Sequence, residues 1–376
     1  MSPEIHVRHK PSPRWRCRLK TALAATIARA RARGLTAPLA RDGRQPLVLG
    51  YHRVVDDYGA LVGIDMPGML VSTRMFERHL DWIGRRFRFV TLDEVGEAAA
   101  SGRPFDRPVA AVTFDDGYQD VYAHAFPVLK RKGIPAAVFV VTELVGKPFW
   151  QVHDKLYHLF SKAFTVWPDP GRELMALFGA LGLPAGGVRR QALTDPFSAL
   201  SSTLPALTLT DVRRVMDRLE ASVGNGFQPV PRTLNWAELA EMQAAGVAVG
   251  SHTKHHVSLP TESPADVADQ LHGSRRAIEQ QLGVAVRHFA YPGGQFTPSV
   301  VRAVARAGYR FAYTACGHGD PDYPALTIGR LLLWEGSSID AEGRFAPDVL
   351  DCQAHGLWPP SRRCSRLHAR AGAAHE

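Results

Sequence analysis

The amino-acid sequence predicts an α/β fold in which a parallel sheet closes into a barrel. Three observations support this: apolar, β-rich runs alternate with helical patterns after residue 46, about seven such units follow one another, and glycine follows the helical patterns. Strand–helix alternation is typical of parallel sheets, and seven units favour a barrel over an open sheet.

The individual elements follow from the same patterns. We expect strands at 47–52, 109–115, 136–141, 246–251, 287–291, 310–315 and 326–333. We expect helices at 72–86, 119–132, 236–245, 264–282 and 297–307, and each of the last four is followed directly by glycine. Glycine readily adopts the left-handed conformation that ends a helix.

Two stretches depart from this alternation. Residues of about 150–232 are helical in period and contain no strong strand, so we expect a helical insertion between two barrel units. Residues 336–376 resemble a poorly ordered tail, which leaves 46–335 as the main domain.

The positive charge is confined to the start of the chain. Residues 1–45 contain 11 basic and two acidic residues, which accounts for the net charge of +9. The remaining chain balances 34 basic against 34 acidic residues, so the main domain has no electrostatic signature of nucleic-acid binding. We expect 1–45 to be a flexible leader. An alternative is that 15–33 forms a basic amphipathic helix lying on an anionic membrane surface.

Composition bears on the compartment. No run of about 18 apolar residues exists, and the apolar stretch at 22–28 is too short for a convincing signal peptide. Four scattered cysteines form no CxxC pair. We therefore expect a cytoplasmic protein, with attachment to the inner face of a membrane as an option. The oligomeric state is not indicated.

Polar residues gather where the predicted strands end. The residues at these positions are His52, Asp115, Asp116, His252 and Tyr291, and His256 follows His252 by four positions. Parallel strands end at one rim of a barrel, and this rim carries the active site in barrel enzymes. Singly, each element has a plainer explanation: an HxxxH pair is often on the surface, DDG is a turn signal, and His52 suits a buried structural role.

A carboxylate and two imidazoles form a suitable donor set for a divalent metal. Zn²⁺ is the first expectation, with Co²⁺, Ni²⁺ or Mn²⁺ as alternatives. Spacing by four lets His252 and His256 reach one ion if they lie on a helical turn. A metal would offset the adjacent acids Asp115 and Asp116, one of which can stay unligated as a base.

At these motifs the chain resembles the polysaccharide deacetylase family, also called the NodB-homology family or carbohydrate esterase family 4. The resemblance is carried by "TFDDGY" (113–118), "GSHTKHHVSL" (250–259) and "FAYPGG" (289–294), in that order. "FWQVHDKL" and several other stretches are also similar to the family, and roughly 46–335 is covered. The resemblance implies a distorted (β/α)7 barrel and removal of N-acyl groups from amino sugars.

The resemblance also implies residue roles. Asp116, His252 and His256 match the metal ligands, Asp115 matches the general base, and the backbone around Tyr291 matches the oxyanion-binding position.

Two departures from the family pattern stand out. "FAYPGG" lacks the arginine that orients the base in many members, so we expect Asp115 to lose that partner. "LTIGRLLLWEG" offers no acid histidine, and His52 in "GYHRV" is the expected substitute, as in the branch resembling poly-N-acetylglucosamine deacetylases.

Two other functions stay open. A glycosidase would need two carboxylates flanking one bond, which consecutive strand residues disfavour because they point to opposite faces. A carbohydrate-binding protein on the same fold is the second alternative. The glycan is not identified by the sequence; poly-N-acetylglucosamine, chitin-like oligomers, peptidoglycan and lipid-linked sugars are all compatible.

Overall fold

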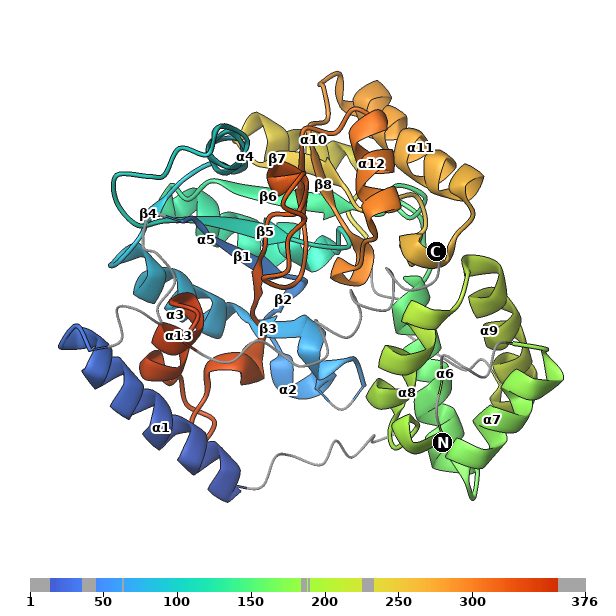
Figure 1. Ribbon diagram of the computed structural model, residues 1–376. Helices are drawn as coiled ribbons and strands as arrows, with labels where there is room; N and C mark the ends of the chain where they lie inside the picture. Colours follow the sequence, from blue (N-terminus) through green and yellow to red (C-terminus); the bar gives the residue numbers. More distant parts are fainter. Residues whose placement is uncertain are drawn as a thin grey trace.

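A curled sheet of parallel strands lies at the centre of the computed structural model (Figure 1), which describes residues 14–35, 45–62, 64–183, 188, 190–224 and 233–357. Its strand order is β10-β1-β5-β6-β7-β8-β9, and β4 pairs with the start of β5. The strands are β1 (Leu47–Tyr51), β4 (Arg88–Phe89), β5 (Val109–Phe114), β6 (Ala136–Val140), β7 (Ala248–Ser251), β8 (His288–Ala290), β9 (Phe311–Tyr313) and β10 (Leu331–Leu332). The distorted seven-unit barrel is therefore confirmed.

The segment before β10 joins the two edges of the sheet. Ile328 bridges Tyr313 in parallel on one side, and Leu331 pairs with Leu49 of β1 on the other. The predicted strand 326–333 is thus a bridge followed by a two-residue strand. A second, two-stranded parallel sheet, β2 (Arg53–Val55) with β3 (Leu70–Ser72), lies below the barrel in Figure 1.

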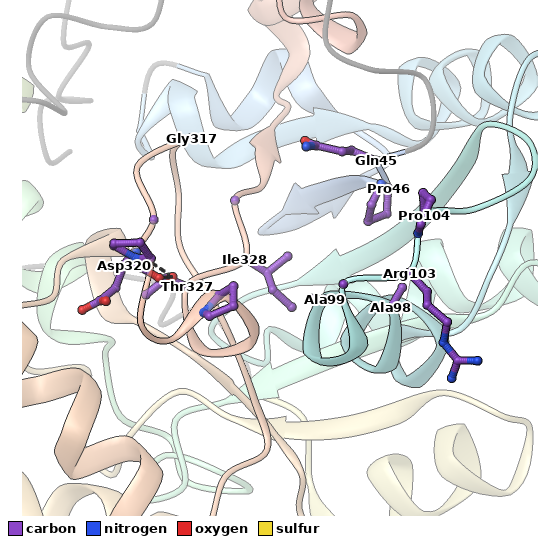
Figure 2. A pocket seen from close by; sticks show the side chains of 15 residues that line it. Gln45, Pro46, Ala98, Ala99, Arg103, Pro104, Gly317, Asp320, Thr327 and Ile328 are labelled. Carbon is purple, nitrogen blue, oxygen red and sulfur yellow. Dashed lines mark hydrogen bonds between the residues drawn. The ribbon is translucent and has the colours of Figure 1, made fainter.

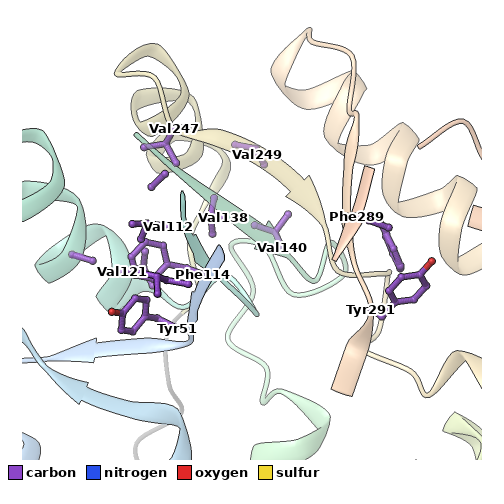
Figure 3. Close-up of a cluster of buried hydrophobic side chains, with 14 of the residues drawn as sticks. Tyr51, Val112, Phe114, Val121, Val138, Val140, Val247, Val249, Phe289 and Tyr291 are labelled. Carbon is purple, nitrogen blue, oxygen red and sulfur yellow. The ribbon is translucent and has the colours of Figure 1, made fainter. Parts of the chain in front are cut away.

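The strands form where the sequence is apolar without interruption. Every residue of β5 and β6 is buried, as expected for a parallel sheet covered on both faces. Figure 3 shows part of the resulting core, in which Val112, Val138 and Val249 come from the neighbouring strands β5, β6 and β7 and Phe114 lies beside Val112. A further cluster around Val48, Phe139 and Phe311 fills a separate space. These cores hold the strand ends in fixed positions.

Helices cover the outside of the barrel (Figure 1). They are α3 (Thr73–Gly84), α4 (Leu92–Ser101), α5 (Phe126–Lys132), α10 (Trp236–Ala244), α11 (Pro264–Leu282) and α12 (Pro298–Arg306). Side-chain caps begin several of them, and left-handed glycines such as Gly133 and Gly283 end α5 and α11. The predicted helix 119–132 begins instead as a π-helical turn, η2 (Val121–Ala125), and α4 had no counterpart among the predicted elements.

The described part of the segment predicted as a helical insertion contains four α-helices (Figure 1, green). These are α6 (Val152–Val166), α7 (Pro170–Ala180), α8 (Pro196–Thr203) and α9 (Leu209–Val223). They share a hydrophobic cluster of their own, with Leu156, Phe160, Leu174 and Val215 among its members. The insertion is therefore a helical lobe beside the barrel.

Short elements complete the described chain. They are α2 (Tyr58–Leu61), the 3-10 helices η1 (Pro67–Met69), η3 (Arg190–Ala192), η4 (Leu204–Ala206), η5 (Leu259–Thr261), η6 (Pro292–Gly294), η7 (Pro324–Leu326) and η8 (Glu335–Ser338), and the terminal helices α1 (Arg14–Ala32) and α13 (Pro347–Ala354).

The segments 14–32 and 336–357 form structure where the sequence led us to expect flexibility. Helix α1 packs on α13, with Ala24 buried against Val349 and Cys352. The Arg31 guanidinium also makes a two-point ion pair with Asp351, at 2.7 Å for each contact. The expectation of a flexible leader is therefore wrong for 14–32, and that of a poorly ordered tail is wrong for 336–357. Residues 1–13 and 358–376 lie outside the described part. Among the described residues, no helix is both long and apolar enough to cross a membrane.

Candidate active site

The loop after β5 turns the two adjacent aspartates in different directions. Asp116 has a φ of 70° and Gly117 a φ of 68°, so the chain reverses through two left-handed residues. Aspartate tolerates this conformation better than most residues other than glycine. Gln151 donates from Nε2 to the carbonyl of Asp116 at 2.8 Å and so holds the turn in place.

The loop after β7 carries both predicted histidine ligands. Gly250 is required just before it, because a Cβ there would lie 2.7 Å from the Phe139 ring and 2.9 Å from a backbone oxygen. Thr253 and His256 have φ angles of 69° and 55°. Together with Asp116, they are the non-glycine residues with positive φ in the described chain. Strained backbone of this kind gathers at functional sites.

The histidines converge on one oxygen of Asp116. Oδ1 lies 3.6 Å from His252 Nε2 and 3.5 Å from His256 Nε2. Ligand atoms held about 2.1 Å from a tetrahedral zinc are separated by roughly 3.4 Å, so each of these two contacts has the spacing expected across a shared ion. Both Asp116 carboxylate oxygens are buried without a hydrogen-bond partner. Such a carboxylate is very costly without a nearby cation, so the donor set fits a divalent metal.

Charges and protonation states agree with this donor set. Burial raises the pKa of Asp116 well above its usual value, and the nearby carboxylates of Asp115 and Asp154 raise it further. Burial lowers the pKa of His252 and His256, so both imidazoles are neutral at neutral pH. His252 Nδ1 lies 2.8 Å from the Ala290 carbonyl, which places the proton on Nδ1 and leaves Nε2 free as a ligand.

A third histidine, which sequence reasoning missed, lies on the other side of Asp116. His153, in the first turn of α6, places Nε2 3.5 Å from Asp116 Oδ2. Asp116, His153 and His256 form a compact group whose ligand atoms all lie within 4.8 Å of one another. The Tyr118 hydroxyl lies 2.9 Å from His153 Nε2 and donates to Asp154 at 2.8 Å. The insertion therefore contributes directly to the site.

Asp115 has an orienting arginine, contrary to the expectation from the sequence. Arg330, just before β10, donates to Asp115 Oδ1 and Oδ2, both at 2.7 Å, and its side chain is 1% exposed. It also donates to the Thr314 carbonyl and the Thr113 hydroxyl, at 3.1 Å each. Burial would raise the pKa of Asp115, but Arg330, assisted by His252 and His52, lowers it to about 2. The expected loss of this partner is therefore wrong; a residue from elsewhere in the chain supplies it.

His52 lies beside Asp115, at the end of β1. Its Nε2 is 4.0 Å from Asp115 Oδ2, and its side chain is 16% exposed. Burial lowers the pKa of His52 to about 4, and the Asp115 carboxylate partly opposes this effect. A neutral imidazole next to a carboxylate can receive a proton once the carboxylate has taken one from water.

Tyr291 lies at the same rim but has no donor available. Its N–H donates to the Tyr313 carbonyl at 3.0 Å, and its hydroxyl donates to the Leu326 carbonyl at 2.9 Å. These bonds occupy the amide that the sequence suggested for oxyanion binding. The amide of Gly293 lies in the first turn of η6, where backbone N–H groups have no acceptor within the helix.

A separate cavity of about 620 Å³ opens between α4 and the loop before β10 (Figure 2). Small residues and backbone form most of its lining, and Arg103 and Asp320 are its charged members. None of the six residues predicted for the site lines this cavity. The candidate chemistry therefore lies at the barrel rim.

Comparisons with known proteins agree with this geometry. The family model "Polysaccharide deacetylase" matches residues 102–174 and 198–312. A putative polysaccharide deacetylase of Bacillus subtilis, YxkH, is 31% identical over 277 residues, which cover 73% of this chain and 70% of the relative. The chain belongs to the polysaccharide deacetylase family. Members of this family are hydrolases that act on amide bonds.

One further relative matches a shorter part of the chain, and two solved structures share its fold. A poly-β-1,6-N-acetyl-D-glucosamine N-deacetylase of Staphylococcus epidermidis is 32% identical over 108 residues, 27% of this chain and 37% of that relative. The match thus spans little more than a third of that deacetylase. IcaB of Ammonifex degensii superposes with a TM-score of 0.51 at 22% identity, covering 83% of this chain and 98% of IcaB. The deacetylase PplD of Streptococcus pyogenes superposes with a TM-score of 0.50 at 17% identity, covering 79% of this chain and 95% of PplD.

The matched segments do not contain the whole site of this polysaccharide deacetylase. Asp115, Asp116 and His153 fall within the first matched segment, and His252 and His256 within the second. His52 and Arg330 lie outside both. Asp115 therefore has two neighbours, next to β1 and β10 at the seam of the barrel, that the family model does not reach.

Proposed function

We propose that the protein is a metal-dependent N-deacetylase that removes acetyl groups from the amino sugars of a glycan. The observation that carries this proposal is the division of labour between the adjacent acids. Asp116 faces imidazoles and no protein cation, whereas Asp115 is held by Arg330 and lies next to His52. One acid is thus suited to hold a metal, and the other to move a proton.

Asp116 Oδ1, His252 Nε2 and His256 Nε2 would hold the metal, with Zn²⁺ first and Co²⁺, Ni²⁺ or Mn²⁺ as alternatives. When bound, such an ion supplies Lewis acidity, which lowers the pKa of water and polarises an amide carbonyl. Three protein ligands leave a position open, as in catalytic zinc sites. In this arrangement His153 Nε2 lies 3.5 Å from the other oxygen, Oδ2, as a neighbour outside the donor set.

Asp115 would act as the general base. The Arg330 guanidinium binds both oxygens of Asp115. The carboxylate is therefore held away from the ligand imidazoles of His252 and His256. The proton that Asp115 takes from the attacking water can pass to His52, which has the higher pKa of the two, about 4 against about 2. His52 would then protonate the departing amine, which is too basic to leave as an anion.

The oxyanion would be bound by a backbone amide at the end of β8. Because the Tyr291 amide is bonded to Tyr313, we assign this role to the Gly293 N–H in the turn that follows. A single such donor contributes about 3–4 kcal/mol to transition-state stabilisation in other hydrolases. Acetate and a free amino sugar would be the products.

The substrate proposal rests on the names of the relatives. Poly-β-1,6-N-acetyl-D-glucosamine is named as the substrate of the Staphylococcus epidermidis deacetylase, and the matched part of that protein is 32% identical to this chain. We therefore propose β-1,6-linked N-acetylglucosamine polymer as the first substrate to test. Other N-acetylated glycans form the comparison set.

The test of this function is release of acetate by the purified full chain. Oligomers of β-1,6- and β-1,4-linked N-acetylglucosamine are incubated with protein before and after treatment with a chelator. We expect acetate release that the chelator abolishes and added Zn²⁺ or Co²⁺ restores. Formation of reducing ends without acetate would indicate a glycosidase, and binding without any product would indicate a carbohydrate-binding protein.

Metal affinity is expected to separate the ligands from their supporting residues. His256→Ala removes a ligand and should weaken Zn²⁺ binding by more than about 100-fold, whereas His153→Asn should weaken it by about 10–100-fold, the range for outer-shell partners. The measurement is competition with a chromophoric chelator. Visible absorption of the Co²⁺ protein reports the coordination number independently of activity. A change of coordination number in His153→Asn would make His153 a ligand.

His255→Asn is the matched control for both variants, because His255 is partly exposed and contacts Gln270 at 3.0 Å. We expect its Zn²⁺ affinity to stay within a factor of two or so of the parent. An unchanged affinity in His256→Ala would contradict the proposed donor set.

A further inference from the structure

Helix α1 presents an apolar stripe to solvent. Trp15, Leu19 and Leu23 are 61%, 62% and 51% exposed, and their spacing of four places them along one side of the helix. Single exposed apolar residues are common on protein surfaces, but three in register on one helix mark an interaction surface. We call these three residues the α1 stripe.

The helix is attached to the body of the protein by its opposite face. Ala24 is fully buried, Lys20 donates to the Ser337 carbonyl at 3.1 Å, and Arg31 pairs with Asp351. Figure 1 shows α1 beside α13 at the edge of the molecule, away from the lobe formed by α6 to α9. The α1 stripe is therefore held on a rigid support that points it away from the protein.

The charge carried by α1 itself is of one sign, although Arg18 pairs with Glu342 at 3.6 Å. Residues 15–33 contain six basic residues and no acidic residue. Of these, Arg16, Arg29 and Arg33 are exposed and have no acidic partner among the described residues. A tryptophan and two leucines flanked by arginines are the composition of a helix that lies at the boundary between lipid headgroups and acyl chains.

We propose that α1 docks the protein on the surface of an anionic bilayer, with the α1 stripe inserted at the headgroup boundary and the arginines against lipid phosphates. The positive charge of α1 is complementary to a negatively charged membrane surface. The α1 stripe can also bury its apolar side chains among lipid, which a soluble polyanion does not offer. This surface is independent of the catalytic proposal, because no residue of the candidate active site belongs to α1.

The test is sedimentation of the full chain with phosphatidylcholine vesicles, with and without phosphatidylglycerol. We expect binding to vesicles that contain phosphatidylglycerol, weaker binding as salt is raised, and little binding to phosphatidylcholine alone. Arg16→Gln, Arg29→Gln and Arg33→Gln combined should weaken partitioning by about fivefold per arginine. Trp15→Ser, Leu19→Ser and Leu23→Ser combined should weaken it by at least about tenfold.

Two matched controls separate a specific surface from general charge or stickiness. Arg103→Gln, Arg107→Gln and Arg213→Gln remove the same charge from exposed positions elsewhere, and Val166→Ser with Val284→Ser removes exposed apolar side chains elsewhere. Both controls should bind as the parent does. Equal loss in the controls, or equal binding to neutral vesicles, would overturn the proposal. So would a dimer in analytical ultracentrifugation that the stripe variant alone abolishes, because the stripe would then face a second copy.

Discussion

Asp115→Asn is expected to lower kcat by about 10²–10⁴-fold while leaving the metal content of the protein unchanged. The amide keeps the shape of the side chain but cannot take a proton from water. Metal binding should persist because both oxygens of Asp115 face Arg330, whereas the histidines face Asp116. Acetate release measures the first effect, and elemental analysis measures the second.

Asp81→Asn is the control for this substitution. Asp81 is an exposed carboxylate that pairs with Lys132 at 2.6 Å, outside the candidate active site. The Asp81→Asn variant should release acetate at the same rate as the parent protein. Retained turnover in Asp115→Asn would reject Asp115 as the base, and loss of metal from that variant would make Asp115 a ligand.

Arg330→Met is expected to lower the free energy of unfolding by about 3–5 kcal/mol, because it leaves the Asp115 carboxylate buried without a counter-charge. It should also lower kcat, since nothing then holds the base in one orientation. Arg330→Lys keeps the charge but loses the bidentate contact. Its free energy of unfolding and its kcat should both lie between those of the parent and of Arg330→Met. Urea denaturation gives the stability, and acetate release gives kcat.

A double variant makes this prediction sharper. Combining Arg330→Met with Asp115→Asn removes both charges. The double variant should therefore have a higher free energy of unfolding than Arg330→Met alone. Arg88→Gln is the surface control: Arg88 pairs with Glu94 where both side chains are more than a third exposed, and its loss should cost no more than about 1 kcal/mol. A similarly small cost for Arg330→Met would contradict the proposed dependence of Asp115 on Arg330.

Much of the barrel could be predicted from the sequence because its strands are short, continuous apolar runs. The rim positions of Asp115, Asp116, His252 and His256 followed from the same patterns, since parallel strands all end at one side. Arg330 was missed although a signal existed: it is a single charge in the apolar run "LTIGRLLL", and a buried arginine requires an acidic partner.

Other features were not readable from local patterns. His153 lies in the family-like stretch "FWQVHDKL" at the start of the insertion, but its local pattern does not show that α6 begins next to Asp116. The engagement of the Tyr291 amide depends on pairing with Tyr313, which is a matter of register between strands. The contact of α1 with α13 joins residues more than 300 positions apart. Each depends on tertiary packing, which periodicity does not reveal.

The position of Arg330 at the seam of the barrel has a consequence for how the protein is made. Asp115 emerges early during translation, and the arginine that offsets it emerges 215 residues later, just ahead of the strand that completes the ring. A nascent chain that ends before Arg330 lacks both the charge that neutralises Asp115 and the strand β10 that closes the barrel. Closure of the ring and pairing of Asp115 with its counter-charge are therefore one event in folding.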